Sequence, residues 1–89
     1  METYGLTLAE YDSILENQDG GCAICGRSPR YNLDVDHDHK TGQVRGLLCK
    51  PCNRHLLPAA DDNQEVLFSA FTYLAWHEQE PVLGGRVIP

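Results

Sequence analysis

The sequence predicts a small α+β domain in which a short β-hairpin lies between an N-terminal and a C-terminal helix. Three observations support this class: an apolar helical face after a capping motif, two β-prone runs around a glycine-containing turn, and a longer apolar stripe near the C-terminus. The 89 residues suffice for one domain. A domain of this size buries only about 60% of the surface that its unfolded chain exposes, so a metal, disulfides or a partner chain is expected to supplement the core.

The first helix is predicted within residues 1–21. Thr7 and Glu10 have the spacing of a capping box, in which the threonine side chain caps the helix start and the glutamate reaches back. Gly20 and Gly21 are expected to end the helix as a C-cap and turn. The apolar residues between these signals share one helical face: Leu8, Tyr11, Ile14 and Leu15.

The hairpin and a short helix are predicted within residues 22–57. Leu33–Val35 and Val44–Leu48 are the β-prone runs, with Gly42 in the turn between them. The helix is expected from Lys50 or Pro51 to about Leu56, followed by a linker at 58–60.

The C-terminal helix is predicted within residues 58–81. Asp61 or Asp62 is expected to cap it, and Pro81 to stop it after about Glu80, leaving residues 82–89 as a tail. A wide apolar stripe is expected to pack on the first helix and the central unit: Val66, Leu67, Ala70, Phe71, Tyr73 and Leu74. Phe68 and Trp76, off that stripe, are candidates for a homodimer contact.

The charge is unevenly distributed along the chain. The net charge is −6, which by itself argues against a nucleic-acid ligand. Residues 22–55, however, carry six basic against three acidic side chains, whereas the remainder carries one basic and ten acidic side chains. The centre is therefore electropositive between acidic arms.

Targeting and membrane signals are not found. The first residues contain no basic region followed by an apolar run, so we expect no signal peptide. No apolar run approaches the roughly 20 residues that cross a bilayer. The expected location is the cytoplasm, where cysteines stay reduced, and no membrane partner is expected.

Two paired cysteine motifs indicate a structural zinc site. Cys22-x-x-Cys25 and Cys49-x-x-Cys52 together offer four thiolates, which is the set that a tetrahedral zinc ion needs. Two disulfides, four free thiols or a redox pair are the alternatives, but a redox role for one pair leaves the other unexplained. A zinc site would contribute folding free energy directly and would close the segment 33–48 into a loop. Such an ion is coordinatively full, so it is not expected to be catalytic.

The centre of the chain contains the segments CAIC, DVDHDH and TGQVRGLLCKPCN, which span Cys22 to Asn53. In these segments it resembles the recombination endonuclease VII family, within the His-Me finger (HNH-like) nucleases. The resemblance implies a ββα-metal unit that grips one divalent ion and one scissile phosphate. Members that resolve branched DNA dimerise through longer helical tails. The resemblance also implies a bacteriophage or prophage protein that acts in the host cell.

The resemblance further implies roles for individual residues. Asp36 and Asn53 would bind the catalytic ion, His37 would be the general base, and His39 an accessory histidine. The chemistry fits these residue types, because an imidazole accepts a proton near neutral pH. Mg²⁺ or Mn²⁺ neutralises charge on the phosphate and the leaving 3′ oxygen, and prefers oxygen ligands. Three basic side chains are candidates for flanking phosphate contacts: Lys40, Arg45 and Arg54.

Two functions thus remain from the sequence. The first is a divalent-metal-dependent DNA endonuclease. The second is a zinc-stabilised DNA-binding or adaptor module that keeps the fold without cleaving. One geometric condition applies to the first, because Asp36 and His37 would point to opposite faces of a regular strand. We therefore expect the strand to end or bulge at these residues.

Overall fold

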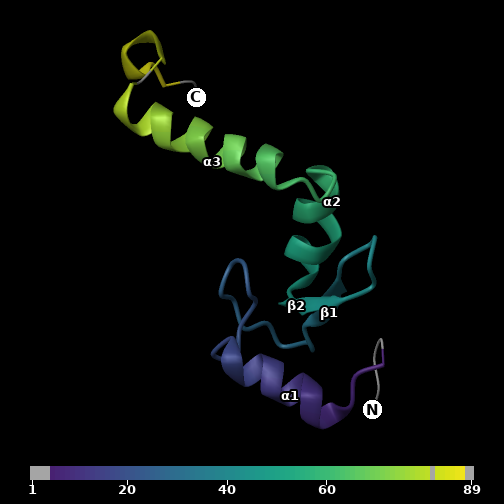
Figure 1. The fold of residues 1–89 in the computed structure, drawn as a ribbon. Helices are drawn as coiled ribbons and strands as arrows, with labels where there is room; N and C mark the ends of the chain where they lie inside the picture. The colour runs from purple at the N-terminus through teal and green to yellow at the C-terminus, as the bar shows by residue number, and fades with distance from the viewer. Residues whose placement is uncertain (1–4, 81, 88–89) are drawn as a thin grey trace. The chain divides into compact units, whose positions relative to one another are not determined.

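The computed structural model describes residues 5–80 and 82–87 and divides the chain into two compact units, Met1–Pro58 and Ala59–Pro89. The first unit contains helix α1 (Leu8–Asn17) and an antiparallel hairpin of β1 (Asp34–His37) and β2 (Val44–Leu48). A helical segment follows the hairpin from Lys50, as predicted, and includes the π-helical turn Cys52–Leu56. In Figure 1 the hairpin lies between α1 and this segment. The α+β class is therefore confirmed.

Helix α1 begins as the sequence predicts. The Thr7 hydroxyl accepts from the backbone N–H of Glu10, and the Glu10 carboxylate accepts from the backbone N–H of Thr7. The backbone hydrogen bond from Thr7, and then that from its hydroxyl, lower the pKa of the Glu10 carboxyl. The C-cap is Gln18 and not one of the predicted glycines, but Gly20 lies in the turn after it in a left-handed conformation (φ 77°), as a glycine beyond a helix C-terminus readily does.

The hydrophobic core of the first unit is small. Tyr11 of α1 is buried and its hydroxyl donates to the Leu33 carbonyl at 2.7 Å. The other members of the core are Cys22, Leu33, Val35, Leu47, Leu48, Cys49 and Cys52. Because three cysteines belong to it, the core and the cysteine cluster form one packing unit.

The helix after the hairpin is longer than predicted. It continues through α2 (Leu57–Ala59), so Pro58 lies inside a helix and residues 58–60 are not a simple linker. The backbone N–H of Leu57 donates to the Cys52 carbonyl, which is the wider spacing of a π-helix. This turn carries Asn53 and Arg54 directly after a zinc-ligand candidate.

The described part of the second unit contains helix α3 (Gln64–Gln79) and the short turn η2 (Val82–Gly85). The predicted cap at Asp61 or Asp62 is wrong: both residues have positive φ values, 54° and 55°, whereas a cap is extended. Asn63 caps α3, and its Oδ1 accepts from the backbone N–H of Glu65 at 2.8 Å. Helix α3 ends near Glu80 as predicted; the stop signal Pro81 lies outside the described residues.

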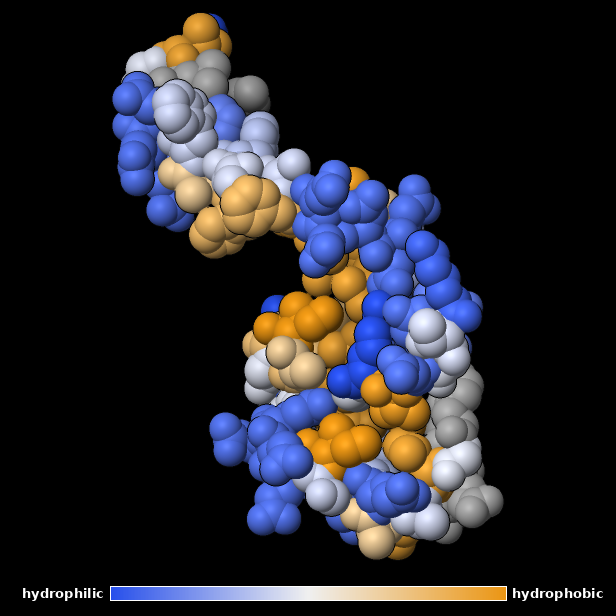
Figure 2. Space-filling view, viewed as in Figure 1, coloured by the Kyte–Doolittle hydropathy of each residue, from blue (hydrophilic) through white to orange (hydrophobic). Residues whose placement is uncertain are grey.

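The apolar stripe of α3 forms no core within its own unit. No described residue of α3 is buried, and the large apolar side chains that are exposed include Phe68, Phe71, Leu74 and Trp76. Apolar surface is visible along this helix in Figure 2. The predicted packing of this stripe on the first unit, and the homodimer contact, stay predictions.

Candidate metal and phosphodiesterase site

The four cysteines predicted to bind zinc form one cluster. The Sγ atoms of Cys22, Cys25, Cys49 and Cys52 all lie within 4.8 Å of one another. A tetrahedron with zinc–sulfur bonds of about 2.3 Å has sulfur–sulfur edges of about 3.8 Å. The Cys25 and Cys49 Sγ atoms are 3.6 Å apart, close to that edge length. The donor set therefore fits a zinc ion.

Two peptide segments shape the cysteine cluster. The first knuckle is closed by the Cys22 N–H donating to the Arg27 carbonyl and the Gly26 N–H donating to the Cys22 carbonyl. Gly21 precedes it with no room for a side chain, since a Cβ there would lie 2.5 Å from the Gly26 carbonyl oxygen. The second segment carries Cys49 and Cys52 and follows β2 directly.

The thiols of the cluster differ in how readily they ionise. Burial opposes ionisation of Cys22, but backbone N–H groups near its sulfur outweigh burial and lower its pKa to about 6. Burial, followed by contacts with Cys49 and Cys22, raises the pKa of Cys52 to about 12. One thiolate thus forms readily, and its charge opposes ionisation of a second thiol. A bound divalent cation would stabilise all four thiolates.

A β-bulge lies at the position that the proposed chemistry requires. Asp36 pairs with Gly46 but His37 pairs with Val44, so Arg45 is an extra residue in β2. The strand β1 also ends at His37. The expected interruption is therefore confirmed, and the extra residue belongs to the partner strand β2.

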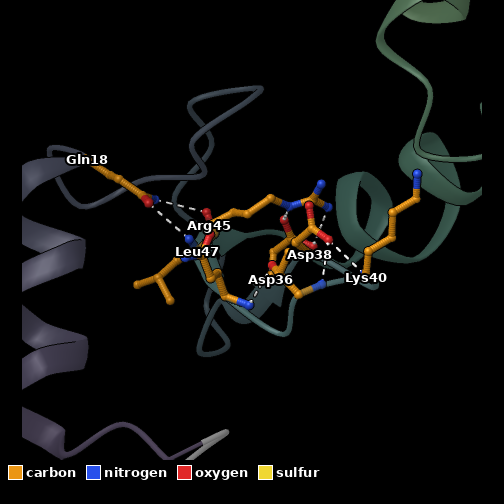
Figure 3. A network of polar contacts seen from close by, with 8 residues as sticks. Gln18, Asp36, Asp38, Lys40, Arg45 and Leu47 are labelled. Atoms are coloured by element: carbon orange, nitrogen blue, oxygen red, sulfur yellow. Dashed lines mark hydrogen bonds and ion pairs between the residues drawn. The ribbon is translucent and has the colours of Figure 1, made fainter.

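The bulge brings Arg45 to Asp36. The Arg45 Nε donates to Asp36 Oδ2 at 2.7 Å and Nη2 donates to Oδ1 at 3.2 Å, which makes a bidentate pair (Figure 3). The Asp36 side chain is 9% exposed and that of Arg45 is 34% exposed. Gly46 is the direct cross-strand neighbour of Asp36. One candidate metal ligand is thus held in a fixed orientation by one candidate phosphate contact.

The two motif histidines lie together beyond the paired carboxylate. The ring centroids of His37 and His39 are 5.1 Å apart with an edge-on arrangement. His37 is half-buried at the end of β1, whereas His39 is exposed in the turn. The turn therefore presents two imidazoles next to each other at one end of the hairpin.

Asp38 organises this turn. Its Oδ1 accepts from the backbone N–H of Lys40 at 2.7 Å and of Thr41 at 3.0 Å. The bond from Thr41, followed by that from Lys40, lowers the pKa of the Asp38 carboxyl. No metal-binding task is expected of Asp38 from the motif, and the structure uses it to close the turn. The Lys40 side chain is exposed beside it (Figure 3).

Asn53 contacts the start of β1 at Asp34, a residue that sequence reasoning missed. Its Nδ2 donates to Asp34 Oδ2 at 3.1 Å, and Arg54 Nε donates to the same oxygen at 3.0 Å. Asp34 and Asp36 alternate along β1 and so share one face of the strand, about 7 Å apart. The alternation of Asp34 and Asp36 was the sequence feature that could have indicated Asp34 as a further site residue. Asn53 and Arg54 thus contact Asp34, two residues before Asp36 and its partner Arg45.

Comparison with known proteins identifies the class to which this chain belongs. The family model described as recombination endonuclease VII matches residues 1–76. The chain belongs to the recombination endonuclease VII family.

Two relatives from bacteriophages match the whole chain. The Gene 59 protein of Mycobacterium phage D29 is 48% identical over 91 residues, and that of Mycobacterium phage L5 is 46% identical over 91 residues. Each alignment covers 100% of this chain but 55% and 56% of the relative, so the chain spans about half their length. No solved structure matches. Among the described residues, no helix is both long and apolar enough to cross a bilayer.

Proposed function

We propose that this chain is a divalent-metal-dependent DNA endonuclease of the His-Me finger (HNH-like) type, with a ββα-metal site in its first unit. The observation that carries the proposal is the position of three residues on or beside β1. Asp36 and His37 are neighbours at the bulge, and Asn53 contacts Asp34, two residues before Asp36. The family supports a nuclease, and the combination of a carboxylate, an amide and an imidazole is the set that phosphodiester hydrolysis needs.

In this proposal Asp36 and the Asn53 amide oxygen hold a Mg²⁺ or Mn²⁺ ion. The ion supplies charge neutralisation at the phosphate and at the leaving 3′ oxygen. The pairing of Asp36 with Arg45 does not exclude a cation, because a carboxylate offers about four acceptor sites and Arg45 uses two. His37 takes the proton from the attacking water, and His39 lies beside it as an accessory group.

The substrate in this proposal is DNA, held by the basic side chains of the central segment. Arg45 and Arg54 are oriented by carboxylates of β1, and Lys40 is exposed in the neighbouring turn. Two oriented guanidiniums and one ammonium suit contacts to phosphates, which position a duplex without reading its sequence.

The test is cleavage of supercoiled plasmid with Mg²⁺ or Mn²⁺. We expect the zinc-loaded protein to nick or linearise the plasmid, and His37→Ala to lose activity by about 10²- to 10⁴-fold. His77→Ala is the matched control, because His77 belongs to α3 in the other unit and contacts Tyr73. Both variants must retain their zinc. A four-way junction then separates branched-DNA cleavage from nicking.

A zinc-stabilised module that binds DNA without cutting it is the second candidate. The bidentate pairing of Asp36 with Arg45 favours it, since that pair also has a structural interpretation. Binding of DNA by the native protein with no cleavage in either metal would establish the module and refute the nuclease.

A further inference from the structure

We propose that Asp34 is a positioning residue that fixes which end of the Asn53 amide faces the catalytic ion. The proposal rests on the proposed function, because it concerns the oxygen of Asn53 as a metal ligand. It assigns a role to a residue outside the Asp-His-Asp-His motif.

The chemistry of the contact determines the amide orientation. A carboxylate paired with an arginine can only accept hydrogen bonds, whereas an asparagine side chain has a donating and an accepting end. The end of Asn53 that faces Asp34 must therefore be Nδ2, which lies 3.1 Å from Oδ2. The Oδ1 atom is then directed away from Asp34 and is the end that can accept a cation.

Arg54 forms an ion pair with the same carboxylate. It donates from Nε to Oδ2 at 3.0 Å and from Nη2 to Oδ1 at 3.3 Å, so both carboxylate oxygens are engaged. The Asp34 side chain is 19% exposed, which limits competition from water, whereas that of Arg54 is 56% exposed. Without Asp34, the amide of Asn53 loses the partner that distinguishes its two orientations. Residues that orient metal ligands in this way typically contribute about 10- to 100-fold to metal affinity.

The experiment measures Mn²⁺ affinity of the zinc-loaded protein without DNA, by electron paramagnetic resonance of free Mn²⁺. Asp34→Val removes the acceptor oxygens of residue 34. Valine has nearly the same side-chain volume as aspartate and a high β-strand propensity. Asp34→Asn removes the charge but keeps an acceptor oxygen. We expect Asp34→Val to weaken Mn²⁺ binding by about 10-fold or more. We expect the Mn²⁺ affinity of Asp34→Asn to remain within about 3-fold of the native value. An uncharged acceptor can still orient the Asn53 amide, so this result would show that Asp34 acts by orientation.

Two further variants separate the alternatives. Arg54→Ala removes only the ion pair, and loss of a positive charge should not weaken binding of a cation. Asn53→Ala should weaken Mn²⁺ binding as loss of a direct ligand does. If Asp34→Val does not retain one zinc per chain, Asp34→Ala takes its place in the comparison with Asp34→Asn.

The outcomes distinguish this proposal from the function on which it rests. Equal losses in Asp34→Val and Asp34→Asn would show that Asp34 acts through its charge and would overturn the positioning role. If Asp34→Val binds Mn²⁺ as tightly as the native protein and Asn53→Ala binds it more weakly, the positioning role is also overturned, while the proposed function stays intact. No Mn²⁺ binding by the native protein, or an unchanged Asn53→Ala, would refute the proposed metal site and the role of Asp34 with it.

Discussion

Removal of zinc is predicted to unfold the first unit. Outside the cysteines, the buried core among its described residues consists of five side chains, namely Tyr11, Leu33, Val35, Leu47 and Leu48. A unit of this size has a net stability of roughly 3–9 kcal/mol. Apparent binding free energies of structural zinc sites are about 10–16 kcal/mol, which exceeds that whole stability. Chelation should therefore unfold the hairpin as well as the cysteine cluster.

The assay has to report on the first unit alone. The single tryptophan, Trp76, belongs to α3, so its fluorescence reports on the other unit. We would follow hydrogen exchange of the β1 and β2 amides before and after chelation. Protection should disappear with zinc, return when Zn²⁺ is added, and not return with Mg²⁺. Hairpin amides that stay protected in zinc-stripped, fully reduced protein would refute this reasoning.

Three further predictions concern single residues. Arg45→Ala leaves a carboxylate that is 9% exposed without its guanidinium, and should lower the free energy of unfolding by about 1–3 kcal/mol in urea titrations, with Arg45→Lys intermediate. Gln18→Ala removes three hydrogen bonds to the backbone of Gly21 and Leu47 and should cost about 2–4 kcal/mol in the same titration. Its matched control is Glu16→Ala, on the exposed part of α1, which should be nearly neutral. Gly21→Ala places a Cβ 2.5 Å from the Gly26 carbonyl oxygen and should weaken zinc binding in a chelator competition; unchanged zinc affinity would show that the knuckle relaxes freely.

The features that the sequence predicted correctly depend on local patterns. The capping box of Thr7 and Glu10, the hairpin around Gly42 and the two cysteine pairs each follow from spacing within a few residues, and all three are present. The interruption of β1 at His37 followed from a geometric requirement of the proposed chemistry. Patterns of this kind are decided by neighbours along the chain.

The features that the sequence did not predict depend on distant contacts or on backbone conformation. Asp34 meets Asn53 across 19 residues, and Gln18 meets Leu47 across 29 residues. The cap of α3 is Asn63 because the two preceding aspartates are in left-handed conformations, which no periodicity reveals. A linker was expected at Pro58, but the π-helical turn before it carries the helix onward.

The strand β2 links the cysteine cluster, which could hold a zinc ion, to the residues of the proposed catalytic site. Arg45 orients Asp36, and Gly46 leaves space for the Gln18 side chain, whose oxygen lies 3.0 Å from the position of an added Cβ. Gln18 accepts from the Leu47 N–H at 2.9 Å and donates to its carbonyl at 2.9 Å (Figure 3). Cys49 follows Leu48 directly, so the same strand runs from the partner of the proposed catalytic carboxylate to the cysteine cluster. Loss of any cysteine ligand should therefore displace Arg45 and Asp36 together, although neither belongs to the cysteine cluster.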